Sequence, residues 1–141
     1  MLNVFSRAKY VSLTNSSPVK TKDVYFNQPV RTGTQSIVVV GRALLVAGTP
    51  KDVTVKARLI YKDNAFLSGS NLSGKICDKT KSALGTINIT SLSVGEAVDF
   101  AYNVEEIGDY KVCVGIELEF KHSNSGASLE VQVEAGILLT R

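Results

Sequence analysis

The feature that most constrains this chain is a strict alternation of apolar and other residues in its last third. The apolar members of the first run are Tyr110, Val112, Val114, Ile116, Leu118 and Phe120. A period of two held this long is typical of a β-strand with one buried face. The same rhythm returns after a polar loop at 122–126, with Leu129, Val131, Val133, Ala135, Ile137 and Leu139.

Two long strands joined by a short Ser/Asn/Gly loop predict a β-hairpin. The six large apolar side chains of its first strand would contribute about 9–18 kcal/mol of gross stabilisation, so the rest of the chain is expected to pack around it. This pattern places Val114 and Ile116 in the core and Glu117 on the opposite, solvated face, where Glu117→Gln should cost little.

Further strand patterns occur upstream. Residues 36–46 predict one long strand with a bulge or bend at Gly41, and residues 53–61 predict a strand whose outer face is polar except at Ile60. The other expected elements are short strands at 86–89 and 97–102, a turn at 93–96 and a polar loop at 63–85. No window carries a helical stripe. The prediction is an all-β, single-domain antiparallel β-sandwich, arranged as a jelly roll of about eight strands.

The first part of the chain has a different character. Residues 1–30 are expected to form an extended N-terminal arm, because Pro18 and Pro29 exclude long central strands there. Such an arm either pairs at a sheet edge or reaches onto another chain. Residues 1–62 carry a net charge of +8 and residues 63–141 a net charge of −5. Antiparallel pairing either averages this difference or leaves a basic and an acidic side, suited to a charged partner.

Residues that could carry catalysis or hold a metal are sparse. His122 is the only histidine and is expected to be an exposed loop residue, and two distant cysteines do not complete a zinc site. Glu117 and Glu119 share a strand face, as a glycosidase pair would, but a solvated face balanced by Lys111 and Lys121 is the simpler interpretation. We therefore predict no enzymatic activity, no metal, no cofactor and no small-molecule substrate.

Cys77 and Cys113 are predicted to be free thiols, because the chain begins without the pattern of a secretory signal peptide. The most apolar stretch, at 37–47, is too short to span a bilayer and is interrupted by glycine and arginine, so no membrane association is expected. Nucleic-acid binding is not expected either. The net charge is only +3, and the tyrosines of the basic half follow strand patterns.

Short motifs occur along the chain in a recognisable order. They are Phe5-Ser-Arg-Ala8, the polar stretch 12–21, Val53-Thr-Val55 running on to Asp63-Asn-Ala-Phe66, Ile89-Thr-Ser-Leu92 with Val94-Gly95, Val98-Asp-Phe100, Gly108-Asp-Tyr110 and Val133-Glu-Ala-Gly136. Together they resemble the small jelly-roll capsid cement (decoration) proteins of short-tailed bacteriophages, of the Bordetella-phage type.

The resemblance implies a structural virion protein that binds the outside of the capsid and stabilises contacts between major capsid subunits, without catalysis or cofactor. It would be made in the host cytoplasm and reside on the outer surface of the virion. Its partners would be the major capsid protein and a second copy of itself, since two-fold homodimers are the commonest closed assembly. The residues expected to contact partners are Phe5, Arg7, Lys9, Tyr10, Arg31 and Leu138.

Two alternatives stay open. A small viral jelly-roll coat protein would build its own shell and should carry a strongly basic arm, whereas this arm is only mildly basic. A β-sandwich binding module for sugar or peptide would need exposed aromatic residues on one face, and the chain has no Trp.

Overall fold

The computed structural model describes residues 2–6, 8–14, 17–31, 35–61, 76–77, 81–104, 112–122 and 127–139. Every helix or strand in these residues is a β-strand, which confirms the all-β prediction, and none of them forms a helix able to cross a membrane. The strands are β1 (Leu2–Phe5), β2 (Lys9–Leu13), β3 (Val19–Arg31), β4 (Gln35–Gly48), β5 (Val53–Tyr61), β6 (Ile76–Cys77), β7 (Ser82–Ile87), β8 (Ala97–Val104), β9 (Val112–His122) and β10 (Ala127–Leu139).

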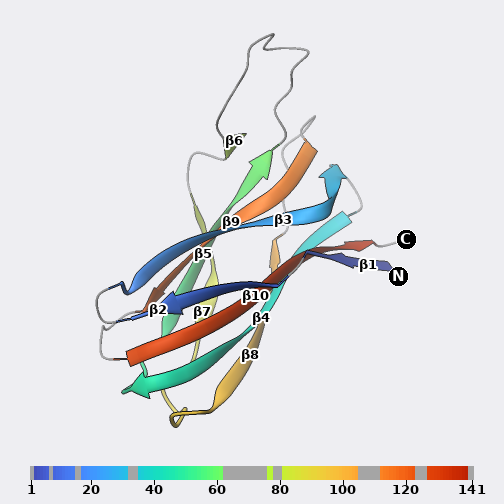
Figure 1. The fold of residues 1–141 in the computed structure, drawn as a ribbon. Coiled ribbons are helices and arrows are strands. Elements are labelled where there is room, and N and C mark those ends of the chain that lie inside the picture. Colours follow the sequence, from blue (N-terminus) through green and yellow to red (C-terminus); the bar gives the residue numbers. More distant parts are fainter. Residues whose placement is uncertain are drawn as a thin grey trace.

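The strands form two antiparallel sheets that lie face to face (Figure 1). Sheet A has the order β1/β2, β10, β4, β8, because β1 and β2 pair one after the other with the same edge of β10. Sheet B has the order β3, β9, β5, β6/β7, because β6 and β7 likewise share one edge of β5.

Counting each divided strand once gives eight strand positions among the described residues, and their pairing is nested. The first pairs with the last, the second with the seventh, the third with the sixth and the fourth with the fifth. This is the arrangement of a long strand pair rolled into two sheets, a jelly roll, and it confirms the predicted fold class.

The predicted hairpin between the two alternating segments does not form. β9 lies in sheet B between β3 and β5, whereas β10 lies in sheet A between β1/β2 and β4. Both strands exist, and each buries its apolar face, but the faces meet across the sandwich and the strands do not pair. Alternation identifies the buried face of a strand but not the strand that it pairs with. The same pattern is therefore found when two consecutive strands lie in different sheets and face each other across the core.

The core is the apolar layer between the sheets. Its fully covered members, each at most 3 % exposed, include Leu13, Ile37, Val39, Leu45, Leu129, Val131 and Val133 from sheet A and Val24, Val53, Val55, Leu59, Ile116, Leu118 and Phe120 from sheet B. The ring of Phe100 in sheet A meets the ring of Phe120 in sheet B edge-on, with centroids 6.4 Å apart. Burial of each large side chain stabilises the fold by about 1.5–3 kcal/mol, so this layer holds the two sheets together.

β4 is one continuous strand, as the sequence predicts, but its irregularity is not at Gly41. The register of β4 against β10 shifts at Val46, which has no partner on β10. Gly41 stays in register and has another role. A Cβ at this position would collide with the ring of Phe100 and with the backbone oxygen of Gln132. Glycine is needed here because other groups approach the backbone closely.

The predicted turn at 93–96 is present and leads into β8. The N–H of Glu96 donates to the oxygen of Ser93 at 2.9 Å, and the N–H of Gly95 donates to the oxygen of Leu45 at 2.9 Å. The N–H of Leu45 in turn donates to the oxygen of Glu96 at 3.0 Å. Gly95 has a φ of 93°. These bonds define a G1 bulge with Gly95 at its left-handed position.

The expected loop at 63–85 is wrong in part, since β6 and the start of β7 fall within it. The expected short strand at 86–89 is also displaced, because β7 ends at Ile87. β7 is an edge strand with a register shift against β5, and it alternates poorly. A strand with so little buried surface leaves a weak signal in the sequence.

The described part of residues 1–30 pairs at sheet edges, the first of the two possibilities considered for an arm. β1 and β2 form one edge of sheet A, and β3 forms one edge of sheet B. The pairing of β3 with β9 is interrupted between Tyr25 and Val30, a gap that contains Pro29. Proline is tolerated on an edge strand at such an irregularity.

Of the two core positions predicted on β9, Ile116 is confirmed and Val114 is wrong. Ile116 is fully buried, whereas Val114 is half-buried. The register of β9 against β5 shifts here, since Ile60 pairs with Gly115 and Tyr61 with Cys113. Val114 is the extra residue of this bulge, and its side chain is only half-buried.

We predict that Ile116→Ala lowers the free energy of unfolding by about 2–5 kcal/mol, because it opens a cavity in a packed layer. Val114→Ala should cost clearly less, because its side chain already contacts water. Denaturant unfolding of both variants under one set of conditions checks this order. Equal losses would show that Val114 is packed as tightly as Ile116.

Candidate functional site

Three of the sequence-predicted contact residues lie on one edge of sheet A, and a fourth lies on the strand next to that edge. Phe5 lies in β1 and Leu138 in the facing part of β10, within the same ladder. Lys9 and Tyr10 lie in β2, further along that edge. Tyr10 is 64 % exposed, the largest exposed fraction among the described large apolar side chains. It faces Gln132 of β10 and therefore lies on the outer side of sheet A.

The remaining two predicted contact residues are not part of this group. Arg31 ends β3 in sheet B. Arg7 lies outside the described residues, as do the side chains of Phe5, Arg31 and Leu138.

The outer surface of sheet A, which we call the sheet A face, carries apolar side chains along β4 on both sides of Arg42. Its residues include Tyr10, Val38, Val40, Arg42, Leu44, Asp99 and Gln132. The alternate residues of β4, which include Ile37, Val39 and Leu45, are buried in the core. A strand that is hydrophobic on both faces is typical of burial on both sides. Yet every described strand belongs to one of the two sheets, and none lies over this face.

Polar groups on the sheet A face are arranged in cross-strand pairs. The Nε of Arg42 donates to Oδ1 of Asp99 at 2.7 Å, and this hydrogen bond, together with the guanidinium charge, lowers the pKa of the Asp99 carboxyl. The hydroxyl of Ser12 donates to the Glu130 carboxylate at 2.8 Å. A shallow depression of about 390 Å³ lies over β10, β4 and β8 beside the Arg42–Asp99 pair. It is open, so it suits a protruding side chain better than an enclosed small ligand.

The outer surface of sheet B carries a network of charged side chains. Arg58 on β5 faces Glu117 on β9, and its Nε donates to Glu117 Oε1 at 2.8 Å. The Nζ of Lys81 lies 3.4 Å from Glu117 Oε1 and 3.1 Å from Glu119 Oε1. The Glu117 side chain is only 4 % exposed, against 24 % for Glu119. The register of β5 against β9 places Arg58 directly opposite Glu117, and Lys81, the residue before β7, completes the network.

This corrects the expectation of a solvated carboxylate face. Glu117 and Glu119 do share a face, and their partners among the described residues include Arg58 and Lys81, whereas Lys111 lies outside the described residues. Both carboxylates are engaged by cations, which is a structural arrangement and not that of a free acid and base.

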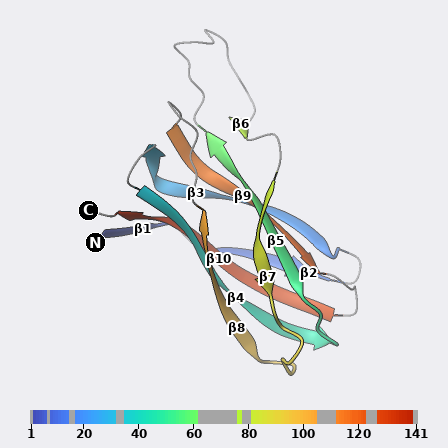
Figure 2. The same ribbon diagram turned by 180° about the vertical axis from the view of Figure 1, so that it is seen from behind.

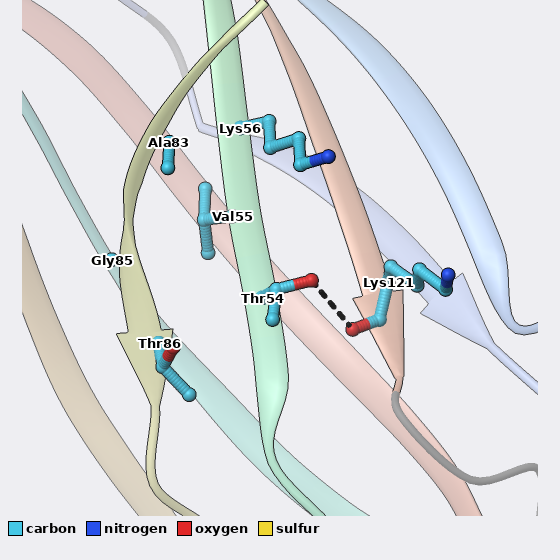
Figure 3. Close-up of a pocket in the computed structure, with 7 residues that line it drawn as sticks. All are labelled: Thr54, Val55, Lys56, Ala83, Gly85, Thr86 and Lys121. Atoms are coloured by element: carbon cyan, nitrogen blue, oxygen red, sulfur yellow. Dashed lines mark hydrogen bonds between the residues drawn. The ribbon is translucent and has the colours of Figure 1, made fainter.

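A groove lies next to this network, between β7 and the neighbouring strands (Figure 3). It has a volume of about 440 Å³ and is lined by Thr54, Val55, Lys56, Ala83, Gly85, Thr86 and Lys121. The register shift of β7 between Val55 and Lys56 lies within this groove. The hydroxyl of Thr54 donates to the backbone oxygen of Lys121 at 3.4 Å. Its described lining holds ammonium and hydroxyl groups and no carboxylate, histidine or cysteine.

His122 is not an exposed loop residue, as the sequence suggested. It is the last residue of β9, points inward and is 3 % exposed. The N–H of Lys51 donates to its Nε2 at 3.0 Å, and its own N–H donates to the oxygen of Pro18 at 2.9 Å. Nδ1 is buried without a hydrogen-bond partner among the described residues, and so is Oδ1 of Asp52. Burial lowers the pKa of His122 and favours the neutral ring.

The titratable residues singled out from the sequence do not form a common site. His122 faces the core from β9, whereas Glu117 and Glu119 lie on the opposite face of that strand. No group of three or more His, Cys, Asp or Glu side chains within the described residues could hold a metal ion.

Charges from the two halves of the chain interleave in the described structure. Arg42 pairs with Asp99, and Arg58 and Lys81 pair with Glu117. These contacts join the basic first half to the acidic second half, apart from Lys81, which belongs to the second. Antiparallel pairing therefore averages part of the charge difference that the sequence shows.

The backbone positions of the cysteines are compatible with free thiols. Cys77 pairs with Ile60 and Cys113 pairs with Tyr61, so the two strands that carry them flank β5. Strands on either side of a third lie about 10 Å apart, whereas Cα atoms joined by a disulfide lie within about 7 Å. Thiol titration of the unfolded, non-reduced protein should therefore count both cysteines.

No protein-family model and no curated protein sequence matches the chain. Solved structures that resemble it include the Drosophila NLP core, described with pentamer formation and histone binding, at 14% identity over 94% of this chain and 97% of that chain, TM-score 0.36. Others are a disulfide-linked pilus protein of Bacillus endospore appendages (10% identity, 99% and 88%, TM-score 0.34) and the CBM22-1 xylan-binding domain of Paenibacillus barcinonensis Xyn10C (11%, 93% and 94%, TM-score 0.38). At these TM-scores the likenesses carry no argument about function.

We predict that Glu117→Gln destabilises the protein by about 1–3 kcal/mol, against the small effect expected from the sequence alone. The change leaves Arg58 and Lys81 without their shared counter-charge, and the loss stays below that of a fully buried pair because both cations are partly in water. Glu119→Gln is the matched control and should cost less, since Glu119 is more exposed. Urea unfolding of both variants measures the difference, and equal costs would contradict the network.

We also predict a loss of stability below about pH 6.5 that depends on His122. Its pKa is lowered in the native state, so the unfolded chain binds the proton first, near pH 6.5. The stabilisation is complete above that pH and is lost as the pH falls towards the native pKa. His122→Gln, whose amide oxygen can still accept from Lys51, should flatten this part of the curve. Urea unfolding at a series of pH values tests it, and identical slopes would refute the assignment.

Proposed function

We propose that this chain is a non-enzymatic structural protein that binds another protein through the sheet A face. The observation that supports this most is that Val38, Val40 and Leu44 on the outer side of β4 are only half-buried, and no described strand lies over them. Apolar side chains that the fold leaves partly open to water on one face are a feature of protein contact surfaces. Tyr10, at the rim of this face, has the properties of an interface anchor.

The specific role that we propose is that of a bacteriophage head cement protein. It would bind the outer surface of the capsid and stabilise contacts between major capsid subunits, as the resemblance in the sequence implies. Jelly rolls are common in viral capsid proteins, which is compatible with this role. Two of the resembling motifs, Val98-Asp-Phe100 and Val133-Glu-Ala-Gly136, belong to β8 and β10 of sheet A.

The proposal also fixes location and partners. The protein would be made in the host cytoplasm and act on the virion surface, with the major capsid protein and a second copy of itself as partners. Nucleic acid, membrane, cofactor and small-molecule substrate have no part in it. Many weak contacts repeated on a lattice would stiffen the shell through avidity, so no single contact has to be strong.

The test uses head shells of a short-tailed phage of the Bordetella-phage type, prepared without their cement protein. Purified protein is mixed with these shells, and co-sedimentation and the melting temperature of the shell are measured. The proposal requires saturable binding at a fixed ratio to the shell subunit and a raised melting temperature. Tyr10→Ala should weaken binding strongly. Tyr25→Ala is the matched control, since Tyr25 is 49 % exposed but lies on the outer side of sheet B.

Two outcomes would overturn the cement role, and a third would overturn the assignment of the contact to the sheet A face. Protein that stays in the supernatant does not bind this class of shell. Protein that assembles closed particles by itself, seen by electron microscopy, is a coat protein. Equal loss of binding in the two tyrosine variants would remove the sheet A face from the contact.

A further inference from the structure

The sheet edges of the described structure differ in how well they are protected against pairing with another strand. The β1/β2 edge is broken between the two strands, and the β6/β7 edge is divided and has a register shift. The β3 edge carries Lys20, Lys22 and Pro29. Breaks, lysines, prolines and bulges are the usual means of preventing edge pairing.

β8 has none of these features. It pairs with β4 without interruption over residues 97–104, and its sequence, Ala-Val-Asp-Phe-Ala-Tyr-Asn-Val, contains no Lys, Arg, Pro or Gly. No described strand pairs with its other side. Figures 1 and 2 show β8 at the margin of the molecule from both directions. A long, regular and nearly uncharged edge strand is a template for a further strand.

The G1 bulge sets which backbone groups face this open edge. Leu45 exchanges hydrogen bonds with Gly95 and Glu96, so the next exchanging pair is Ala43 with Val98. Exchanging and non-exchanging pairs alternate along an antiparallel ladder. The N–H and C=O groups of residues 98, 100, 102 and 104 therefore point to β4, and those of residues 97, 99, 101 and 103 point to the open edge.

The side chains on the core side of β8 are also incompletely covered. Phe100 is buried, but Val98, Tyr102 and Val104 pack against the core and remain partly exposed. A further strand that brings apolar side chains to the same side would cover them, with a gain of about 25 cal/mol for each Å² removed from water.

From these observations we infer that β8 is a self-association edge. A second copy of this chain pairs its own β8 antiparallel to it about a two-fold axis, and sheet A continues from one protomer into the other. The pairing is self-complementary, because β8 supplies to its partner the same open backbone groups and the same apolar side chains that it needs to have covered.

The register follows from the side chains. Residues directly opposite in an antiparallel pair lie on the same face, so a two-fold pair must be centred on a residue. Centred on Ala101, the core side pairs Val98 with Val104 and Phe100 with Tyr102 of the second copy. The outer side pairs Asp99 with Asn103, whose amide can donate to the carboxylate. No two charges of like sign are opposite each other, and Asp99 is the only charge on the strand.

This dimer deepens the self-association included in the proposed function, but it does not depend on capsid binding. A two-fold axis perpendicular to the sheet leaves both sheet A faces on the same side of the dimer. Both copies of Tyr10 would then face one surface. Failure of the dimer would leave shell binding by the monomer intact, and failure of shell binding would leave the dimer intact.

Sedimentation velocity of the full chain over a wide range of concentrations tests the inference. Wild-type protein should show a monomer–dimer equilibrium. Ala101→Lys places two ammonium groups opposite each other at the two-fold axis and should abolish the dimer. Ala47→Lys is the matched control, an exposed alanine on central strand β4, and should leave the dimer unchanged. Unfolding curves show that both variants are folded.

A second measurement tests the register. Residues at the open edge would form exchanging pairs, whose Cα atoms lie about 5.5 Å apart, within the range of a disulfide. Under mild oxidation Ala101→Cys should therefore give a covalent dimer, whereas wild type and Ala47→Cys should not. A wild-type chain that is monomeric at all concentrations overturns the inference. A dimer that survives Ala101→Lys, or that does not cross-link through position 101, overturns it as well.

Discussion

The structure depends on one apolar layer that lies between two sheets and has no other cover. Each long strand offers one continuous apolar face, and a single sheet cannot hide such a face from water. The nested pairing of first with last strand brings the faces together, so β9 and β10 meet across the layer although they are neighbours in the chain. Because the interior is filled by side chains, everything available for binding lies on the two outer faces and at the open edges.

Alternation predicted the strands well and their neighbours poorly. Ile116, Leu118 and Phe120 are buried as the period of two requires, and His122 continues the same parity, so its burial was present in the pattern. The predicted hairpin was wrong, because two consecutive strands can bury their apolar faces equally well as neighbours in one sheet or as members of two facing sheets. The burial of Glu117 could not be predicted from the sequence. Its partner Arg58 lies on β5, far away in the sequence, and only the register of β5 against β9 brings the two side chains together.

The candidate site left one trace in the sequence, the run at 37–47 that is apolar on both parities. A half-buried strand should alternate, and Val38, Val40 and Leu44 break that rule on the outer side of β4. The run is too short for a membrane span. Its apolar residues on both parities are typical of a strand that is buried on both faces. Under the proposed function the outer face is covered by another chain, and a single sequence holds no signal for the identity of that chain.

The open edge and the uncovered face belong to the same sheet, and this has a consequence for how the molecule could act. Three of the sheet edges carry breaks, lysines or proline. These features interrupt the strand ladder and prevent non-specific pairing between copies of the chain. Leaving one edge regular restricts growth to a single direction, and a two-fold axis closes it after one step. Sheet B carries instead a network of Arg58, Lys81, Glu117 and Glu119 on its outer side. A molecule built in this way can double its contact surface without forming a fibre, which is the property that a protein binding to a regular lattice needs.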